Sequence, residues 1–221
     1  MGDLFSALFL SLRIAISATA IVAVFGIPLA YFLGRRRFVG QTLIETLLTV
    51  PLVLPPTVVG YLIILTLGVR SPIGSLLDRA FGYRLLFSFP GAVLAAVVVS
   101  LPLLLIPARA AFAAIEPEYE EIARLFGAGR LSTFWHVNLP LARRGIASGL
   151  LLAFARALGE FGATVMVFGS QEDRQTLPIS IYQDFIGREF SHAMPAVVLL
   201  SIVSLVVIYA YNRAPDRTRS R

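Results

Sequence analysis

The chain alternates between long apolar runs and shorter polar segments, and this alternation is its dominant pattern. A helix needs about 20 consecutive apolar residues to cross the hydrocarbon core of a bilayer. Five runs are long enough, and they cover residues 14–34, 43–68, 89–115, 146–169 and 195–211. The pattern predicts an all-α integral membrane protein with five membrane-spanning helices in a single domain, residues 1–221. The first run follows Asp3 instead of a basic region and continues to Leu33, so we expect an uncleaved span rather than a signal peptide.

Counting arginines in the polar segments orients these spans. Segments 35–42, 116–145 and 212–221 contain Arg35, Arg36, Arg37, Arg124, Arg130, Arg143, Arg144, Arg213, Arg217, Arg219 and Arg221. The opposite segments contain only Arg70, Arg79, Arg84, Arg174 and Arg188. The positive-inside rule therefore places the N-terminus outside and the C-terminus in the cytoplasm. Arg109 and Glu45 fall near cytoplasmic helix ends, where we expect long side chains to snorkel to the interface.

Composition narrows the class further. The chain is 57% hydrophobic and 14% charged, which leaves too few polar side chains to cover a soluble domain of this size. The net charge of +6 comes from arginines at the ends of apolar runs, a pattern of membrane topology rather than of nucleic-acid binding. There is no cysteine, so disulfides and thiolate ligands are excluded. His136 and His192 lie in separate polar segments, and no metal site is predicted.

The second and fourth runs contain residues that are unusual inside a membrane span. Pro55 and Pro56 interrupt the second run, and they indicate either simple packing kinks or helices that bend around a path. Arg156 and Glu160 lie one helical turn apart in the fourth run, where an unpaired charge is costly. They form either a structural ion pair or part of a translocation path or its gate.

The cytoplasmic segment 116–145 has the pattern of a small polar helical unit between two spans. "EPEYEEIARLFGAG" predicts a helix that starts at Pro117 with acidic residues in its first turn and ends before Gly127 and Gly129. "RLSTFWHV" predicts a second short helix with Ser132 as its N-cap. The adjacent aromatics Phe134 and Trp135 either pack on the chain's own spans or dock into a partner.

This segment resembles the EAA motif of permease subunits of ABC importers, in which E-A-A is followed by three residues, Gly, nine residues and I-x-L-P. Here the matching residues are Glu121, Ile122, Ala123, Gly127, Val137, Leu139 and Pro140. Ile122 replaces the first alanine and Val137 the isoleucine, and both keep the apolar character. The resemblance implies a coupling helix that docks on a separate ATP-hydrolysing subunit through these residues together with Ser132, Phe134 and Trp135.

The resemblance extends over nearly the whole chain and points to the molybdate permeases. It is carried by "GIPLAYFLGRRRFVG", "PLVLPPTVVGYL", "GAVLAAVVVSLPLL", "LLAFARALGEFGATVMV" and "QTLPISIY". The run "LGEFGAT" looks specific to permeases for tetrahedral oxyanions. The expected residues of the translocation path or gate are Pro55, Pro56, Arg156, Glu160, Gly162 and Thr164.

The resemblance also implies the assembly. It implies the fold of a type I ABC importer, a homodimer in the cytoplasmic (inner) membrane of a prokaryote, two ATPase subunits and an extracytoplasmic oxyanion-binding protein. The sequence has no G-x-x-x-x-G-K-[ST] motif, so we expect a transport subunit without its own enzymatic site. ATP and Mg²⁺ are then bound by the partner ATPase, and no cofactor is expected in this chain.

Two other interpretations of the transport function stay open. In the molybdate permease interpretation the cargo is molybdate and also tungstate. A sulfate or thiosulfate permease, the first alternative, would pass similar tetrahedral dianions. An ion-coupled secondary transporter would need no ATPase, but it usually shows inverted repeats and charged relays near the membrane midplane. Five spans without a visible repeat, and only Arg156 and Glu160 inside them, disfavour that alternative.

Overall fold

The structure is a computed structural model that describes residues 2–82, 85–169 and 175–213, and within them it is helical without strands. Three helices are each long and apolar enough to cross a membrane. They are α1 (Gly2–Arg35), α5 (Phe89–Ala113) and α11 (Phe190–Arg213). They confirm the first, third and fifth predicted spans, although α1 starts well before residue 14 because its early turns are also apolar.

Some of the arginines used for the orientation have no structural description. Arg84, Arg174, Arg217, Arg219 and Arg221 lie outside the described residues. The remaining arginines at the predicted cytoplasmic segments include Arg35 in the last turn of α1 and Arg213 in the last turn of α11. An arginine in the last turn also stabilises the helix, because the C-terminal end of the helix macrodipole is negative.

The second predicted span is not a straight helix. It consists of α2 (Gln41–Thr49), the 3₁₀ turn η1 (Val50–Leu52) and α3 (Pro56–Leu67), and the direction turns by 115° between the two parts. Prolines explain the break, because a proline has no N–H to donate and disfavours helical geometry in the residue before it. Pro51 lies in η1, Pro55 is the N-cap of α3 and Pro56 is in its first turn.

The fourth predicted span is also broken. The helices α8 (Leu139–Leu158) and α9 (Gly162–Phe168) meet at a bend of 56° within the "LGEFGAT" run. Among the described residues, the three long helices and the two bent pairs, each pair counted as one span, correspond to the five spans that the sequence predicts. Each of these two spans therefore consists of two helices, and the second helix begins with its own N-terminus at the break.

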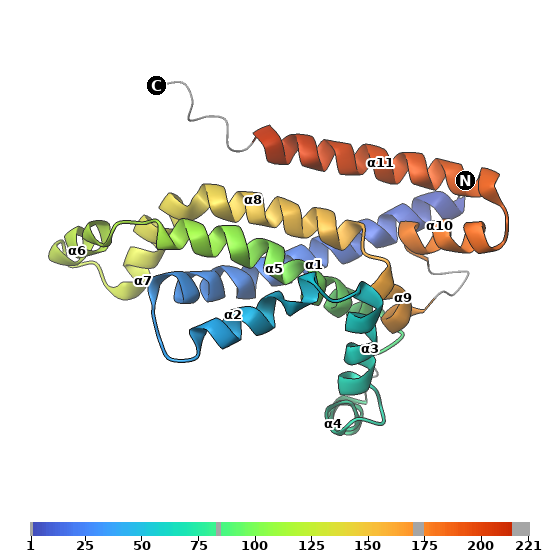
Figure 1. Ribbon diagram of the computed structural model, residues 1–221, viewed down its shortest axis with the longest axis horizontal. Helices are drawn as coiled ribbons and strands as arrows, with labels where there is room; N and C mark the ends of the chain where they lie inside the picture. The colour runs from blue at the N-terminus through green and yellow to red at the C-terminus, as the bar shows by residue number, and fades with distance from the viewer. Residues whose placement is uncertain (1, 83–84, 170–174, 214–221) are drawn as a thin grey trace.

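The remaining elements lie around this bundle. They are α4 (Pro72–Phe81), α6 (Pro117–Leu125), α7 (Arg130–Thr133), the π-helix η2 (Phe134–Asn138) and α10 (Leu177–Ile186). Figure 1 shows α1, α5 and α8 running along the length of the molecule, with α6 and α7 at one end and α10 at the other. The helices α3 and α4 project to one side of the bundle (Figure 1).

Small residues hold the bundle together. Helix α5 is central, because it packs against both α1 and α8. Ala92, Ala96 and Ala108 of α5 are fully buried in the contacts with these neighbours. Between apolar helices in lipid, close approach and van der Waals contact replace the hydrophobic driving force, so small residues are favoured at such contacts.

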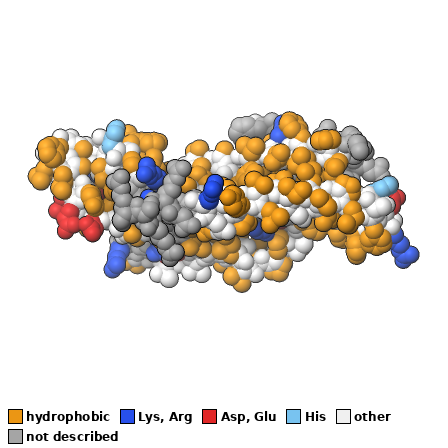
Figure 2. All heavy atoms as spheres, turned by 90° about the horizontal axis from the view of Figure 1, so that it is seen from above, with side chains coloured by type: hydrophobic (Ala, Val, Ile, Leu, Met, Phe, Trp, Pro, Cys, Tyr) orange, Lys and Arg blue, Asp and Glu red, His pale blue; other side chains and the backbone are white. Residues whose placement is uncertain are grey.

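The outer surface is apolar along the bundle. In the view of Figure 2, hydrophobic side chains cover most of the stretch between the two ends, and the acidic side chains lie at the ends. Helix α11 carries exposed Leu205, Val206 and Ile208. This distribution is the one expected for a protein whose sides face lipid.

Gly145 provides a test of the close packing between α8 and α5. A Cβ at Gly145 would lie 2.5 Å from the Cβ of Ala111 and 2.7 Å from the carbonyl oxygen of Pro107, so Gly145→Ala must push the helices apart. We expect a loss of roughly 1–3 kcal/mol and a lower unfolding temperature in detergent, measured by heating followed by size-exclusion chromatography. Gly129→Ala is the control, because a Cβ at Gly129 meets nothing within 4 Å. Equal unfolding temperatures for the two variants would contradict this packing.

Candidate coupling surface and translocation path

The segment between α5 and α8 folds largely as its sequence predicts. Helix α6 has Glu116 as its N-cap, a proline in its first turn and acidic Glu118 and Glu120 beside it. It ends at Leu125, and Gly127 follows with a φ of 81°, a left-handed conformation that favours glycine. This confirms the helix start at Pro117 and the glycine break.

Ser132 is not the N-cap that the sequence predicts. Helix α7 begins at Arg130 with Gly129 as its N-cap, so Ser132 lies inside the helix. Its hydroxyl lies 3.4 Å from Nδ1 of His136. The N-cap prediction was wrong because Gly129, whose backbone is extended, already caps the helix three residues before Ser132.

The adjacent aromatic side chains of Phe134 and Trp135 point in different directions. Phe134 turns inward, with its ring centroid 4.9 Å from that of Tyr31 and 6.4 Å from that of Phe112. Trp135 is 56% exposed at the end of the molecule. The sequence left packing on the chain's own spans and docking into a partner as alternatives. Of these two aromatics, Phe134 packs on the spans and Trp135 is the one exposed on the surface.

The other residues of the EAA-like pattern are divided in the same way. Glu121, Gly127 and Pro140 are exposed, and Ala123, Val137 and Leu139 are half-buried. Leu139 packs against the buried cluster formed by α1, α5 and α8.

An exposed apolar patch covers the end formed by α6, α7 and η2. It consists of Tyr119, Ile122, Leu125, Phe126, Leu131 and Trp135, which we call the coupling surface. Leu125 and Phe126 are 86% and 88% exposed. Leu125, Phe126 and Leu131 were not among the predicted coupling residues, although apolar residues flanking a glycine turn are a signal for such a patch. Several large exposed apolar residues gathered on the elements at one end of a protein indicate a docking site.

Arg156 and Glu160 form the ion pair that their spacing predicts. Nη1 of Arg156 contacts Oε2 of Glu160, whose side chain is 1% exposed, whereas the Arg156 side chain is 29% exposed. The other carboxylate oxygen of Glu160 accepts a hydrogen bond of 2.6 Å from the backbone N–H of Ala163. Glu160 therefore balances Arg156 and also caps the start of α9, where the helix dipole is positive.

The two helix breaks lie against each other. A Cβ added to Gly162 would lie 2.8 Å from Cβ of Pro56 and 3.0 Å from the backbone nitrogen of Thr57. Gly60 of α3 approaches Ala163 of α9 in the same way, with backbone atoms of Ala163 within 3.0 Å of an added Cβ. The structure thus brings Pro56 and Gly162, two of the predicted path residues, into direct contact.

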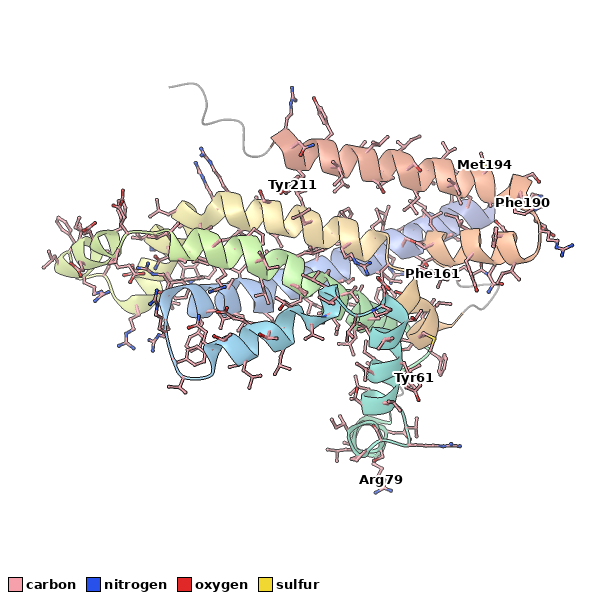
Figure 3. The ribbon with its side chains drawn as sticks, in the orientation of Figure 1. Tyr61, Arg79, Phe161, Phe190, Met194 and Tyr211 are labelled. Atoms are coloured by element: carbon pink, nitrogen blue, oxygen red, sulfur yellow. The ribbon has the colours of Figure 1, made fainter. Side chains whose placement is uncertain are left out.

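The remaining predicted path residues differ in exposure. Pro55 is exposed and Thr164 is 1% exposed, so Thr164 faces the interior of this chain. Figure 3 shows Phe161 at the break between α8 and α9, close to the helix α3 that carries Tyr61. The break is therefore the place where both bent spans and the charged pair come together.

Two ion pairs at the cytoplasmic ends of helices were not anticipated. Glu45 of α2 lies 3.0 Å from Arg109 of α5, where the sequence predicted independent snorkelling. Arg35 of α1 lies 2.8 Å from Glu120 of α6. Sequence separation hides both pairs, because neither has the helical spacing that revealed Arg156 and Glu160. Among the described residues, no group of three or more His, Asp or Glu side chains is placed to hold a metal ion.

Comparisons with known proteins agree with this arrangement. The profile of the family described as "Binding-protein-dependent transport system inner membrane component" matches residues 26–219. The chain is 44% identical over 177 residues to the molybdenum transport system permease protein ModB of Escherichia coli (strain K12), covering 80% of this chain and 77% of that protein. It is 37% identical over 208 residues to ModB of Haemophilus influenzae, covering 91% and 90% of the two chains.

A solved structure has the same fold at low sequence identity. It is a bacterial alginate ABC transporter in complex with an alginate pentasaccharide-bound periplasmic protein. The TM-score is 0.75 at 19% identity, and the match covers 96% of this chain and 78% of that chain. At this identity the likeness concerns the fold alone.

The pair formed by Arg156 and Glu160 yields an asymmetric prediction. Arg156→Gln leaves a 1% exposed carboxylate without its cation, whereas Glu160→Gln leaves an arginine that still reaches the surface. Removing one partner of a buried pair costs about 3–5 kcal/mol, so we expect Arg156→Gln to approach this loss and Glu160→Gln to cost less. The measurement is the unfolding temperature of each variant in detergent.

The double variant and a surface control complete this test. In Arg156→Gln with Glu160→Gln no charge is left unpaired, so its loss should be smaller than the sum of the two single losses. Glu189→Gln, which removes an exposed carboxylate paired with His192, should change stability by no more than about 0.5 kcal/mol. Additive single losses would show that the two side chains do not interact.

Proposed function

Because the chain belongs to the family of binding-protein-dependent transport system inner membrane components, we propose that it is the permease subunit of an ABC importer for molybdate. The observation that supports this cargo is the 44% identity to the molybdenum permease of Escherichia coli over 80% of the chain. Tungstate, a tetrahedral dianion of similar size, is the second cargo. The importer operates in the cytoplasmic membrane of a prokaryote.

The coupling surface is the docking site for the ATPase subunit. It is apolar, it protrudes at one end of the molecule and it contains the EAA-like pattern from Glu121 to Pro140. Aromatic anchors such as Trp135 contribute a large share of binding energy when they fill a pocket of a partner. ATP and Mg²⁺ bind to that partner, and this chain transmits the resulting movement without an enzymatic site of its own.

The conduit forms between two copies of this chain. Apolar side chains are exposed along the side formed by α2, η1 and α3, including Leu47, Tyr61 and Val53, which follows η1. A two-fold axis along the membrane normal would cover this side in both copies and give one docking site for each of two ATPase subunits. The extracytoplasmic binding protein would then meet the end formed by α10.

The path between the copies conducts the oxyanion without holding it tightly. Arg156 is the cation placed at the helix breaks, but Glu160 already neutralises it. A conduit has to bind weakly enough to release its cargo, so a balanced pair serves it better than a free arginine. Selective capture then belongs to the binding protein. ATP drives the cycle through its different affinities for the inward-open and outward-open states.

The cargo is tested with the complete importer in liposomes. We expect ATP-dependent uptake of molybdate, with half-maximal stimulation at a concentration at least about tenfold below that for sulfate, measured with each oxyanion titrated separately. Uptake of sulfate or thiosulfate alone would keep the importer and replace the cargo. Uptake that needs an ion gradient but no ATPase subunit would instead identify a secondary transporter.

Docking is tested by Trp135→Ala. We expect this variant to lose at least about 2 kcal/mol of binding to the ATPase subunit, or about 30-fold in affinity, because Trp135 is the largest exposed aromatic side chain of the coupling surface. Co-purification and native mass spectrometry measure both affinity and stoichiometry, with two copies of each subunit expected. Phe185→Ala, an exposed aromatic of α10, is the control at the opposite end of the molecule. Equal retention of the ATPase by both variants would refute this docking site.

A further inference from the structure

One arginine binds the cytoplasmic end of α1 to the segment 116–145, which we call the coupling segment. The Arg35 guanidinium donates from Nε to Oε1 of Glu120 over 2.8 Å, and Nη2 lies 2.8 Å from the same oxygen. Its Nη1 donates to the carbonyl oxygen of Ile115 over 2.6 Å. One side chain thus joins the last turn of α1, the second residue after the end of α5 and the first turn of α6.

This junction is shielded from water. The side chains of Arg35 and Glu120 are each only 14% exposed. The second carboxylate oxygen of Glu120 is also 3.3 Å from Nη2 of Arg124, which lies one turn further along α6. A guanidinium with several fixed acceptors in a shielded site is a rigid connector, because opening it would leave a poorly hydrated charge on each side.

A second contact lies one helical turn before Arg35. The ring of Tyr31 packs edge-on against Phe112 of α5 and Phe134 of η2, with centroid distances of 5.3 and 4.9 Å. The amide of Asn138, which is fully buried, donates to the Tyr31 hydroxyl over 3.4 Å. The same face of α1 therefore holds both α6 and η2, the two parts of the coupling segment on either side of the glycine turn.

Helix α1 continues from this junction to the opposite end of the molecule. It remains helical over 34 residues, from Gly2 to Arg35. Near its start, the hydroxyl of Ser11, which is 3% exposed, accepts a hydrogen bond of 2.8 Å from the backbone N–H of Leu177. That N–H lies in the first turn of α10, where it has no partner within its own helix. The two ends of α1 thus hold the coupling segment and α10.

We propose that Arg35 is a positioning residue that makes α1 move with the coupling segment, so that displacement of the segment by the ATPase is carried through α1 to α10. This inference rests on the proposed function and adds a route that does not pass through α8, the helix into which the coupling segment leads. The link between Arg35 and Glu120 stays closed throughout the cycle. It acts as a strut and not as a switch.

Arg35→Gln is the direct test, in the complete importer reconstituted in liposomes. The coupling surface is unchanged, so the complex should still co-purify and hydrolyse ATP. Molybdate uptake per ATP hydrolysed should fall about tenfold, the factor that corresponds to about 1.4 kcal/mol of lost coupling. Arg37→Gln removes the same charge two residues away, where the side chain is exposed, and should leave the ratio unchanged. An unchanged ratio in Arg35→Gln would overturn the proposal.

A cross-link tests whether the link between residues 35 and 120 stays closed during transport or has to open. The chain has no cysteine, so Arg35→Cys with Glu120→Cys introduces the only thiols of this subunit. Bridging them with a short bis-thiol reagent should restore uptake per ATP to within about twofold of the unsubstituted importer. A bridged importer that hydrolyses ATP without uptake, or stalls, would show that the junction has to open and would overturn the strut.

The same measurements distinguish failure of the proposed function from failure of the proposed role of Arg35. If the unsubstituted importer takes up no molybdate with ATP, the proposed function fails before any variant is compared. If the unsubstituted importer is active and Arg35→Gln loses the ATPase during co-purification, Arg35 only supports the fold of the docking segment, and the strut is rejected.

Discussion

In a membrane, every backbone N–H that loses its helical partner has to be satisfied by the protein itself, and the two broken spans depend on how this is done. At the start of α3 two donors are absent, because Pro55 and Pro56 have no N–H. At the start of α9 a donor is satisfied by Glu160, which accepts from Ala163. The two helix starts can then lie against each other through Gly162, where no side chain fits. The bends are therefore stable features of the fold, and the helices on either side of them can take different directions.

Three arginine side chains obey the same constraint, because each has a partner within the protein. Arg156 is tolerated because Glu160 lies one turn away, and Arg35 and Arg109 each find a carboxylate from a different helix. Pairing in a shielded place serves two purposes, since it lowers the cost of the charge and fixes the relative position of the elements that supply it. The pair at the helix breaks holds a bend within one span. The pairs at the cytoplasmic end join α1 to α6 and α2 to α5.

The cytoplasmic end shows how one segment can face two ways. Its outer side is apolar and exposed, with Phe126 and Trp135 free to meet a partner. Its inner side is bound to the bundle through Phe134, Asn138 and Glu120. A segment that only docked would not need the second set of contacts. A segment that transmits movement needs both, because force applied at the outer side has to reach the spans.

The sequence by itself determined the features that depend on local pattern. Apolar run lengths gave the five spans, the spacing of Arg156 and Glu160 gave their pairing, and the glycines after α6 gave its end. Only the tertiary structure decided which of Phe134 and Trp135 points outward, that Pro56 meets Gly162, and that Arg35 binds Glu120. These contacts join residues far apart in the chain or depend on which face of a helix is covered. Hydrophobic periodicity reports whether a residue is suited to burial, but the partner is chosen only when the helices pack.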